Sequence, residues 1–226
     1  MSDDVERDYL QPLRALLDFA RTTAAGRRTV ILDMHAPACS INGADHGGWK
    51  TAKSGHYLES SEARDVTRAA VVAMAEVLRG AVSGSPTRGV AALLNEPGVP
   101  PGRLQADYEL TIAALRDAVP DVTPMITAWS YELESIASYA AEQGVWLDAH
   151  IYQKARRRDS SQWEGAFKSD LLQLEKAVRS TTVLIGEWSL ANTQHVFSAN
   201  ENLEYAQWQT RALATTGVAG AVYWNA

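Results

Sequence analysis

The sequence has little of several residue types, and each scarcity argues against a class of protein. A single cysteine, Cys39, stands among 226 residues, so no internal disulfide can staple the fold. No run approaches the roughly 18 apolar residues that a membrane-spanning helix requires. Lys and Arg number 21 against 27 Asp and Glu, a net charge of −6. That balance argues against a protein that binds nucleic-acid phosphates through a basic face.

Two sequence signals are also missing. The start, Met1-Ser2-Asp3-Asp4, is acidic where a signal peptide is basic and then apolar, so we expect a cytoplasmic protein, or a secreted one if the sequence was trimmed. No G-x-G-x-x-G turn follows an apolar run, which disfavours a doubly wound, dinucleotide-binding sheet. We therefore expect no cofactor.

Helix-like and strand-like segments alternate along the chain. Apolar residues recur at helical spacing in one segment, and the next is a short apolar run typical of a buried parallel strand. The expected helices cover about residues 10–20, 62–78, 103–119, 132–143, 161–178 and 198–215. The expected strands cover 29–35, 90–94, 122–128, 145–152, 181–188 and 219–224. This alternation predicts a single α/β domain over 1–226, with a parallel sheet covered by helices.

Six strands are too few for a closed (β/α)8 barrel, which takes about 200 residues at minimum and near 250 as a rule. The sequence opens on a helix and stops on a strand, as if two first strands and a last helix were absent. The predicted fold is therefore an incomplete (β/α)8 TIM-type barrel with about six parallel strands and six helices.

Polar and aromatic residues follow the predicted strands where each strand ends. Catalytic groups of a parallel barrel gather at these carboxyl ends, because that rim faces the substrate. The residues at strand ends include His35, Asn95, Glu96, His150, Tyr152, Glu187 and Trp224. Each one alone is explained by packing or by a solvated loop, but their joint placement favours a catalytic rim.

Four of these segments resemble family 5 of the glycoside hydrolases, and the exo-β-1,3-glucanase branch most of all. They are Val30 to Gly43, Leu94-Asn95-Glu96-Pro97, His150-Ile-Tyr152-Gln153 and Ile185 to Leu190. The likeness covers roughly residues 8 to 226, in the order of the family's motifs. It implies a barrel enzyme that hydrolyses β-glycosides with retention of configuration.

The resemblance also implies a role for each residue. Glu96 is expected as the general acid/base and Glu187 as the nucleophile. The residues expected to contact the sugar are His35, Asn95, His150, Tyr152 and Trp224, with Asn42 and Trp49 from a glycine-rich loop on the same rim. Retention requires the two carboxyl groups about 5–5.5 Å apart.

The departures from the family carry expectations of their own. The family has two further strands before the one that ends at His35, and one of them carries an arginine near the nucleophile. We expect the apolar edges at Val30–Met34 and Val222–Trp224 to pair with a second copy, giving a homo-oligomer. The run that includes Arg156, Arg157 and Arg158 is one candidate to replace the missing arginine, and a solvated loop is the other interpretation.

Two alternatives stay open. A metal hydrolase is disfavoured because the possible ligands Asp33, His35, His46, His56 and His150 show no H-x-x-E-H or H-E-x-x-H spacing, so we expect no metal. A catalytically weakened or inactive barrel that binds carbohydrate is the stronger rival. If the protein is an enzyme, the short chain favours β-glucosides or short β-1,3-gluco-oligosaccharides as substrates.

Overall fold

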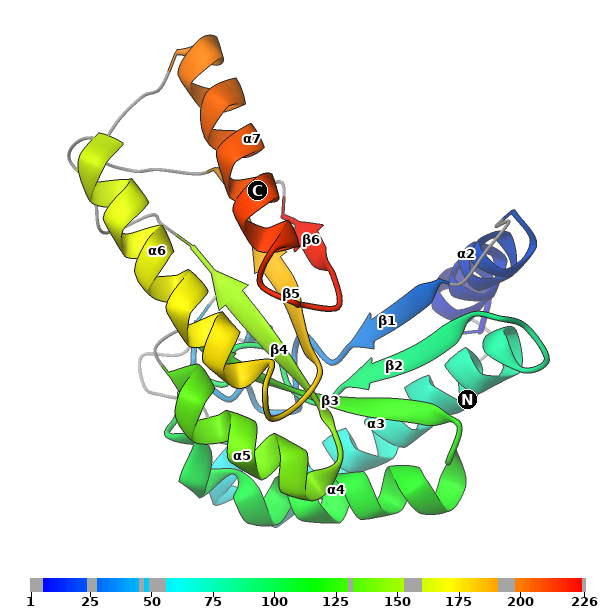
Figure 1. Ribbon diagram of the computed structural model, residues 1–226. Helices are drawn as coiled ribbons and strands as arrows, with labels where there is room; N and C mark the ends of the chain where they lie inside the picture. The colour runs from blue at the N-terminus through cyan, green and yellow to red at the C-terminus, as the bar shows by residue number, and fades with distance from the viewer. Residues whose placement is uncertain are drawn as a thin grey trace. The chain divides into compact units, whose positions relative to one another are not determined.

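The computed structural model describes residues 6–23, 28–44, 47–48, 56–129, 132–152, 160–190 and 198–224. Among these residues, no helix combines the length and the apolar character needed to cross a membrane. The chain divides into two compact units, Met1–Met125 and Ile126–Ala226, which we describe one at a time. Six α-helices and six strands alternate along the described chain (Figure 1), as the sequence predicts.

Unit 1 contains strands β1, β2 and the start of β3, with helices before and between them. Its elements are η1 (Glu6–Leu10), α2 (Gln11–Thr22), β1 (Thr29–Asp33), η3 (Tyr57–Glu59), α3 (Ser61–Val82), β2 (Arg88–Ala92), η4 (Pro101–Arg103) and α4 (Gln105–Ala118), followed by β3 (Val122–Trp129). β1 and β2 are parallel from the pair Thr29↔Arg88 to Asp33↔Ala92. β2 and β3 are parallel from Gly89↔Val122 to Ala92↔Met125.

The core of unit 1 lies between this sheet and helices α3 and α4. Helix α3 packs against α4 and β2 (Figure 1), and its buried residues Val71, Ala75 and Leu78 recur every three or four positions. Strand β2 is buried from Gly89 to Ala92 on both faces, which is the pattern of a strand inside a parallel sheet. This packing holds the carboxyl ends of β1 and β2 side by side.

Unit 2 contains the end of β3 and six further regular elements. They are α5 (Leu133–Gln143), β4 (Trp146–Ile151), α6 (Ser160–Ala177), β5 (Val183–Trp188), α7 (Ala199–Ala214) and β6 (Ala221–Tyr223). β4, β5 and β6 are parallel neighbours in that order. The core side chains of β4 and β5, such as Leu147, Ile151 and Ile185, are almost fully buried.

Strand β5 is bulged just before its end. Between the pairs Asp148↔Leu184 and His150↔Glu187, β5 has one residue more than β4. The pairs Ile185↔Ala221 and Trp188↔Tyr223 show the same excess against β6. A bulge of this kind turns the side chains that follow it, and here the residue that follows is Glu187.

Local sequence signals set several helix ends. The Ser60 side chain accepts a hydrogen bond from the Ala63 N–H at the start of α3, and Ser198 with Glu201 forms a complete capping box at the start of α7. Helix α5 ends at Gly144, whose φ of +59° is left-handed and therefore suits glycine.

Candidate functional site

The carboxyl ends of β1 and β2 in unit 1 bring His35 and Asn95 together. The His35 Nδ1 lies 2.8 Å from the Asp33 carboxylate, and the Asn95 amide nitrogen lies 3.5 Å from His35 Nε2. Because a carboxylate only accepts hydrogen bonds, the proton on Nδ1 is the one donated to Asp33. Asp33 thereby orients the ring so that Nε2 faces Asn95.

Glu96 follows Asn95 in a strained and enclosed turn. Its φ is +38°, a left-handed value that a non-glycine residue rarely adopts, and its residue surface is 8% exposed. The Asn42 amide donates to the Glu96 carbonyl at 2.9 Å, which holds the turn in place. Strain of this size costs of the order of 1–3 kcal/mol and is found most often at functional sites.

The carboxyl ends of β4 and β5 in unit 2 bring Glu187, Tyr152 and His150 together. The Tyr152 hydroxyl donates to Glu187 Oε2 at 2.5 Å, and His150 Nδ1 lies 3.5 Å from the same oxygen. The His150 side chain is 1% exposed and that of Glu187 is 12% exposed. One oxygen of Glu187 is thus held by its neighbours in a nearly water-free position.

Asp148 lies behind this cluster and contacts three groups. Its Oδ2 is 3.1 Å from His150 Nε2 and 3.3 Å from the Thr127 hydroxyl, which donates to it. Its Oδ1 accepts the Gly186 backbone N–H at 2.7 Å. A carboxylate that is 4% exposed needs such donors, because an unpaired charge is costly away from water.

Trp224 lies at the end of β6, beside the residue that follows Glu187. Its backbone N–H donates to the Trp188 carbonyl at 2.8 Å, and 41% of its surface is exposed. The Trp188 and Tyr223 rings meet edge to face with centroids 5.1 Å apart. Trp224 therefore offers an aromatic surface to solvent near the end of β5, as a platform for a sugar ring must.

The predicted site residues fall into two groups that the structure assembles within single units. Asn42, His35, Asn95 and Glu96 are linked by hydrogen bonds or by sequence in unit 1, and His150, Tyr152 and Glu187 form one cluster in unit 2. Trp49 and Arg156–Arg158 lie outside the described residues, so their roles stay predictions.

Asp33 and Asp148 are not among the predicted sugar-binding or catalytic residues; Asp33 is considered only as a metal ligand. A signal for both was present, because each aspartate precedes a histidine by two positions at a strand end. Side chains two apart in a strand point to the same face, so Asp-x-His places a carboxylate beside an imidazole. Its occurrence at two strand ends, in β1 and β4, predicts two oriented histidines.

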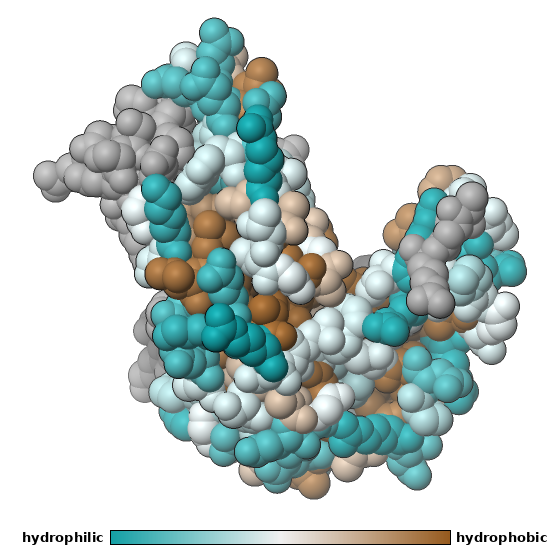
Figure 2. All heavy atoms as spheres, in the orientation of Figure 1, coloured by the Kyte–Doolittle hydropathy of each residue, from teal (hydrophilic) through white to brown (hydrophobic). Residues whose placement is uncertain are grey.

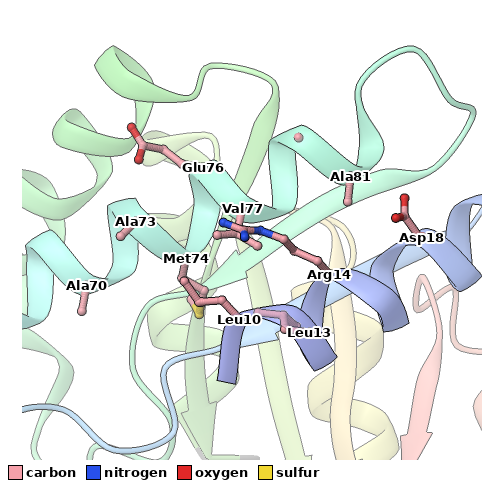
Figure 3. A pocket seen from close by; sticks show the side chains of 11 residues that line it. Leu10, Leu13, Arg14, Asp18, Ala70, Ala73, Met74, Glu76, Val77 and Ala81 are labelled. Atoms are coloured by element: carbon pink, nitrogen blue, oxygen red, sulfur yellow. The ribbon is translucent and has the colours of Figure 1, made fainter. Parts of the chain in front are cut away.

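A hollow in unit 1 is built from residues outside the candidate site. A groove of about 760 Å³ separates α2 from α3, and Leu13 and Met74 face each other across it (Figure 3). Its wall is mostly Leu, Ala, Met and Val, with the charged Arg14, Asp18 and Glu76 also on the lining. The predominance of apolar side chains favours a packing groove between helices over a catalytic site.

No protein-family model and no curated protein matches the sequence. Solved structures of similar fold are found instead. Rutinosidase from Aspergillus niger matches with a TM-score of 0.77 and 14% identity, over 97% of this chain and 64% of that one. The catalytic domain of Thermobifida fusca endoglucanase Cel5A matches with a TM-score of 0.62 and 17% identity, over 97% and 63%.

Endo-glycoceramidase II from Rhodococcus sp., in a complex with cellobiose-like isofagomine, matches with a TM-score of 0.63 and 14% identity, over 96% of this chain and 61% of that one. The chain thus spans less than two thirds of each of these proteins. The likeness establishes the fold: six parallel strands alternating with six helices, an incomplete TIM-type barrel.

Proposed function

We propose that this protein is a retaining β-glycosidase that acts on β-glucosides or short β-1,3-gluco-oligosaccharides, of the exo-β-1,3-glucanase type. Glu187 is its nucleophile and Glu96 its general acid/base. The enzymes of similar fold are named for cleaving glycosides, which supports a glycosidase. The finer assignment rests on the four motifs and on the groups around Glu187.

The observation that carries the proposal is the pair of contacts on Glu187 Oε2. Tyr152 donates to it at 2.5 Å and His150 Nδ1 lies 3.5 Å away. The hydroxyl donates and the carboxylate oxygen accepts, so this contact fixes the position of one oxygen of Glu187. The Tyr152 hydroxyl also stops the Glu187 side chain from rotating away from the sugar.

The reaction has two steps. Glu187 attacks the anomeric carbon while the bond to the leaving oxygen breaks, and Glu96 gives its proton to that oxygen. Glu96, now a carboxylate, takes a proton from water, and the resulting hydroxide attacks the anomeric carbon. The ester bond to Glu187 breaks, which releases a sugar of the original β configuration and restores both glutamates.

The residues of unit 1 would serve the first step. Glu96 is 8% exposed and follows the end of β2, where its carboxyl group would donate the proton to the leaving oxygen. Asn95 and His35, joined at 3.5 Å, lie next to it and would bind sugar hydroxyls. The two glutamate carboxyls must face the same sugar, about 5–5.5 Å apart, and this separation is part of the proposal.

A panel of aryl β-glycosides, assayed with the wild type, Glu187→Ala and Glu96→Gln, tests the proposal. We expect hydrolysis of aryl β-glucosides by the wild type and a loss of at least about 10³-fold with Glu187→Ala. A 2-deoxy-2-fluoro-β-glucoside with a good leaving group should label the wild type covalently, with the added mass on the peptide that contains Glu187.

The same panel addresses the alternative of a carbohydrate-binding protein. Binding of β-1,3-gluco-oligosaccharides without turnover or labelling would favour an inactive barrel. Unchanged hydrolysis by Glu96→Gln would show that Glu96 is not the acid/base. Labelling on another carboxylate would rule out Glu187 as the nucleophile.

We also propose that the protein forms a homo-oligomer through β6. All three residues of this strand are exposed, and Val222 and Tyr223 are 43% and 50% exposed. Hydrophobic side chains reach the surface of unit 2 in Figure 2. An exposed apolar strand that pairs with one neighbour favours pairing with another chain.

A further inference from the structure

We propose that Asp148 is the positioning residue of the nucleophile: a single carboxylate that fixes both the backbone before Glu187 and the imidazole that faces it. This inference rests on the proposed role of Glu187. Asp148 contacts Thr127, His150 and Gly186, and we infer that it acts on Glu187 through the last two.

The first link runs through the backbone of β5. The bulge in this strand takes N–H groups out of the regular ladder, and such groups need another acceptor. Asp148 Oδ1 accepts the Gly186 N–H at 2.7 Å. A Cβ at position 186 would lie 2.2 Å from the same oxygen, so glycine is required for this close approach. Asp148 therefore pins the bulge that aims the next residue, Glu187.

The second link runs through His150. Asp148 Oδ2 lies 3.1 Å from His150 Nε2, and since a carboxylate only accepts, Nε2 must carry a proton. With Nε2 directed to Asp148, the other ring nitrogen, Nδ1, is directed to Glu187 Oε2 at 3.5 Å. The orientation of the ring toward the nucleophile thus depends on Asp148.

An asparagine at position 148 cannot accept hydrogen bonds from both the Gly186 N–H and His150 Nε2. Its one oxygen can accept the Gly186 N–H, but its NH₂ group then faces the Nε2 proton of His150, donor against donor. In the opposite orientation the NH₂ group meets the Gly186 N–H. We expect Asp148→Asn to keep the shorter backbone contact and to remove the proton from His150 Nε2.

The matched control is Thr127→Val. Thr127 donates to the same Oδ2 atom at 3.3 Å and is as buried as Asp148. This hydrogen bond is separate from the contacts that Asp148 makes with Gly186 and His150. Its loss disturbs the packing around Asp148 and leaves both links in place. A role for Asp148 in stability alone would make the two variants behave alike.

The experiment compares the full chain of the wild type, Asp148→Asn and Thr127→Val in aryl β-glucoside hydrolysis and in ¹⁵N spectra of histidine-labelled protein. We expect Asp148→Asn to lower kcat by roughly 10- to 100-fold with KM within about threefold, as loss of an orienting partner does. The Nε2 signal of His150, assigned with His150→Gln, should change from protonated to unprotonated. Thr127→Val should keep kcat within about threefold and keep the His150 signals.

Wild-type kcat in Asp148→Asn, an unchanged His150 Nε2 signal, or an equal loss of kcat in Thr127→Val would each overturn the inference. The failure of the proposed function looks different. In that case the wild type lacks glycosidase activity, while the spectra of the same three proteins still decide whether Asp148 sets the proton on His150.

Discussion

At the scale of single residues, the candidate site contains two histidines that are each oriented by an aspartate. Asp33 orients His35 at 2.8 Å in unit 1, and Asp148 orients His150 at 3.1 Å in unit 2. In both cases the aspartate stands two positions before the histidine. Strand β4 contains Asp148 and His150 and places both on one face, whereas β1 ends at Asp33 and His35 follows two residues later. The difference lies in burial, because the His35 side chain is 39% exposed and that of His150 is 1% exposed.

A second buried carboxylate, Asp107 in α4, has a structural role. It accepts a hydrogen bond from the Tyr57 hydroxyl, and Arg68 Nη2 lies 3.4 Å from its other oxygen. Burial, and then the hydrogen bond to Asp107, raise the pKa of Tyr57 well above its usual value of about 10. The folded state therefore keeps Tyr57 protonated where the unfolded chain ionises it.

We predict that Tyr57→Phe costs about 1–3 kcal/mol at pH 7, because it removes the donor to a buried carboxylate. The raised pKa means that the contribution of Tyr57 is complete below about pH 10 and is lost as the pH rises above that value. Urea unfolding of both proteins at pH 7 and pH 10.5 measures this. The gap in stability between wild type and variant should shrink at the higher pH, and a gap that widens would contradict the account.

At the scale of elements, the short capping signals were the most dependable part of the sequence. Ser198-x-x-Glu201 predicts a helix start, and α7 begins at the next residue, Ala199. The match Ser161-x-x-Glu164 also predicts a helix, and α6 spans Ser160–Ala177. Helix α6 thus begins one residue before the predicted cap, Ser161, and the structure does not describe the side chains of Ser161 and Glu164.

We predict that Ser198→Ala lowers the free energy of unfolding by about 1 kcal/mol. The Ser198 hydroxyl accepts the Glu201 N–H at 3.3 Å, and the Glu201 carboxylate accepts the Ser198 N–H at 2.8 Å, so the substitution leaves one helix N–H without its cap. Denaturant unfolding gives the value. Asn200→Ala, an exposed change in the same turn, should stay within about 0.5 kcal/mol, and equal losses in the two variants would contradict a capping role.

At the scale of the whole molecule, the chain spans less than two thirds of the enzymes it resembles in fold. The proposed homo-oligomer is the consequence we draw from the exposed side chains of β6. Lysine on an exposed strand edge opposes pairing with another chain, because its charge would have to be buried. This gives a direct test of the interface.

We predict that the wild type is larger than a monomer in light scattering at micromolar concentration and that Val222→Lys shifts it toward the monomer. Leu203→Lys serves as the control, since Leu203 is 57% exposed on α7 and lies outside the proposed edge. A wild type that is monomeric throughout would contradict the oligomer. An oligomer that Val222→Lys leaves intact would place the interface elsewhere.

By itself the sequence determined the α/β alternation and the six strands, and it placed the candidate site residues at strand ends. These are local properties, because the spacing of apolar residues, the helix caps and the positions of strand ends depend on residues that are close together in the chain. Strand β4 is predicted at 145–152 and is found at Trp146–Ile151. The local sequence pattern therefore located this strand to within one residue at each end.

Only the tertiary structure decided that Asp148 joins His150 to the Gly186 backbone. That contact spans 38 residues and depends on a bulge that puts one extra residue into β5. No local pattern marks the bulge, because it exists only in the register between two paired strands. The types of the site residues can be read from the sequence. The contacts that orient their side chains form only when strands distant in the sequence pair.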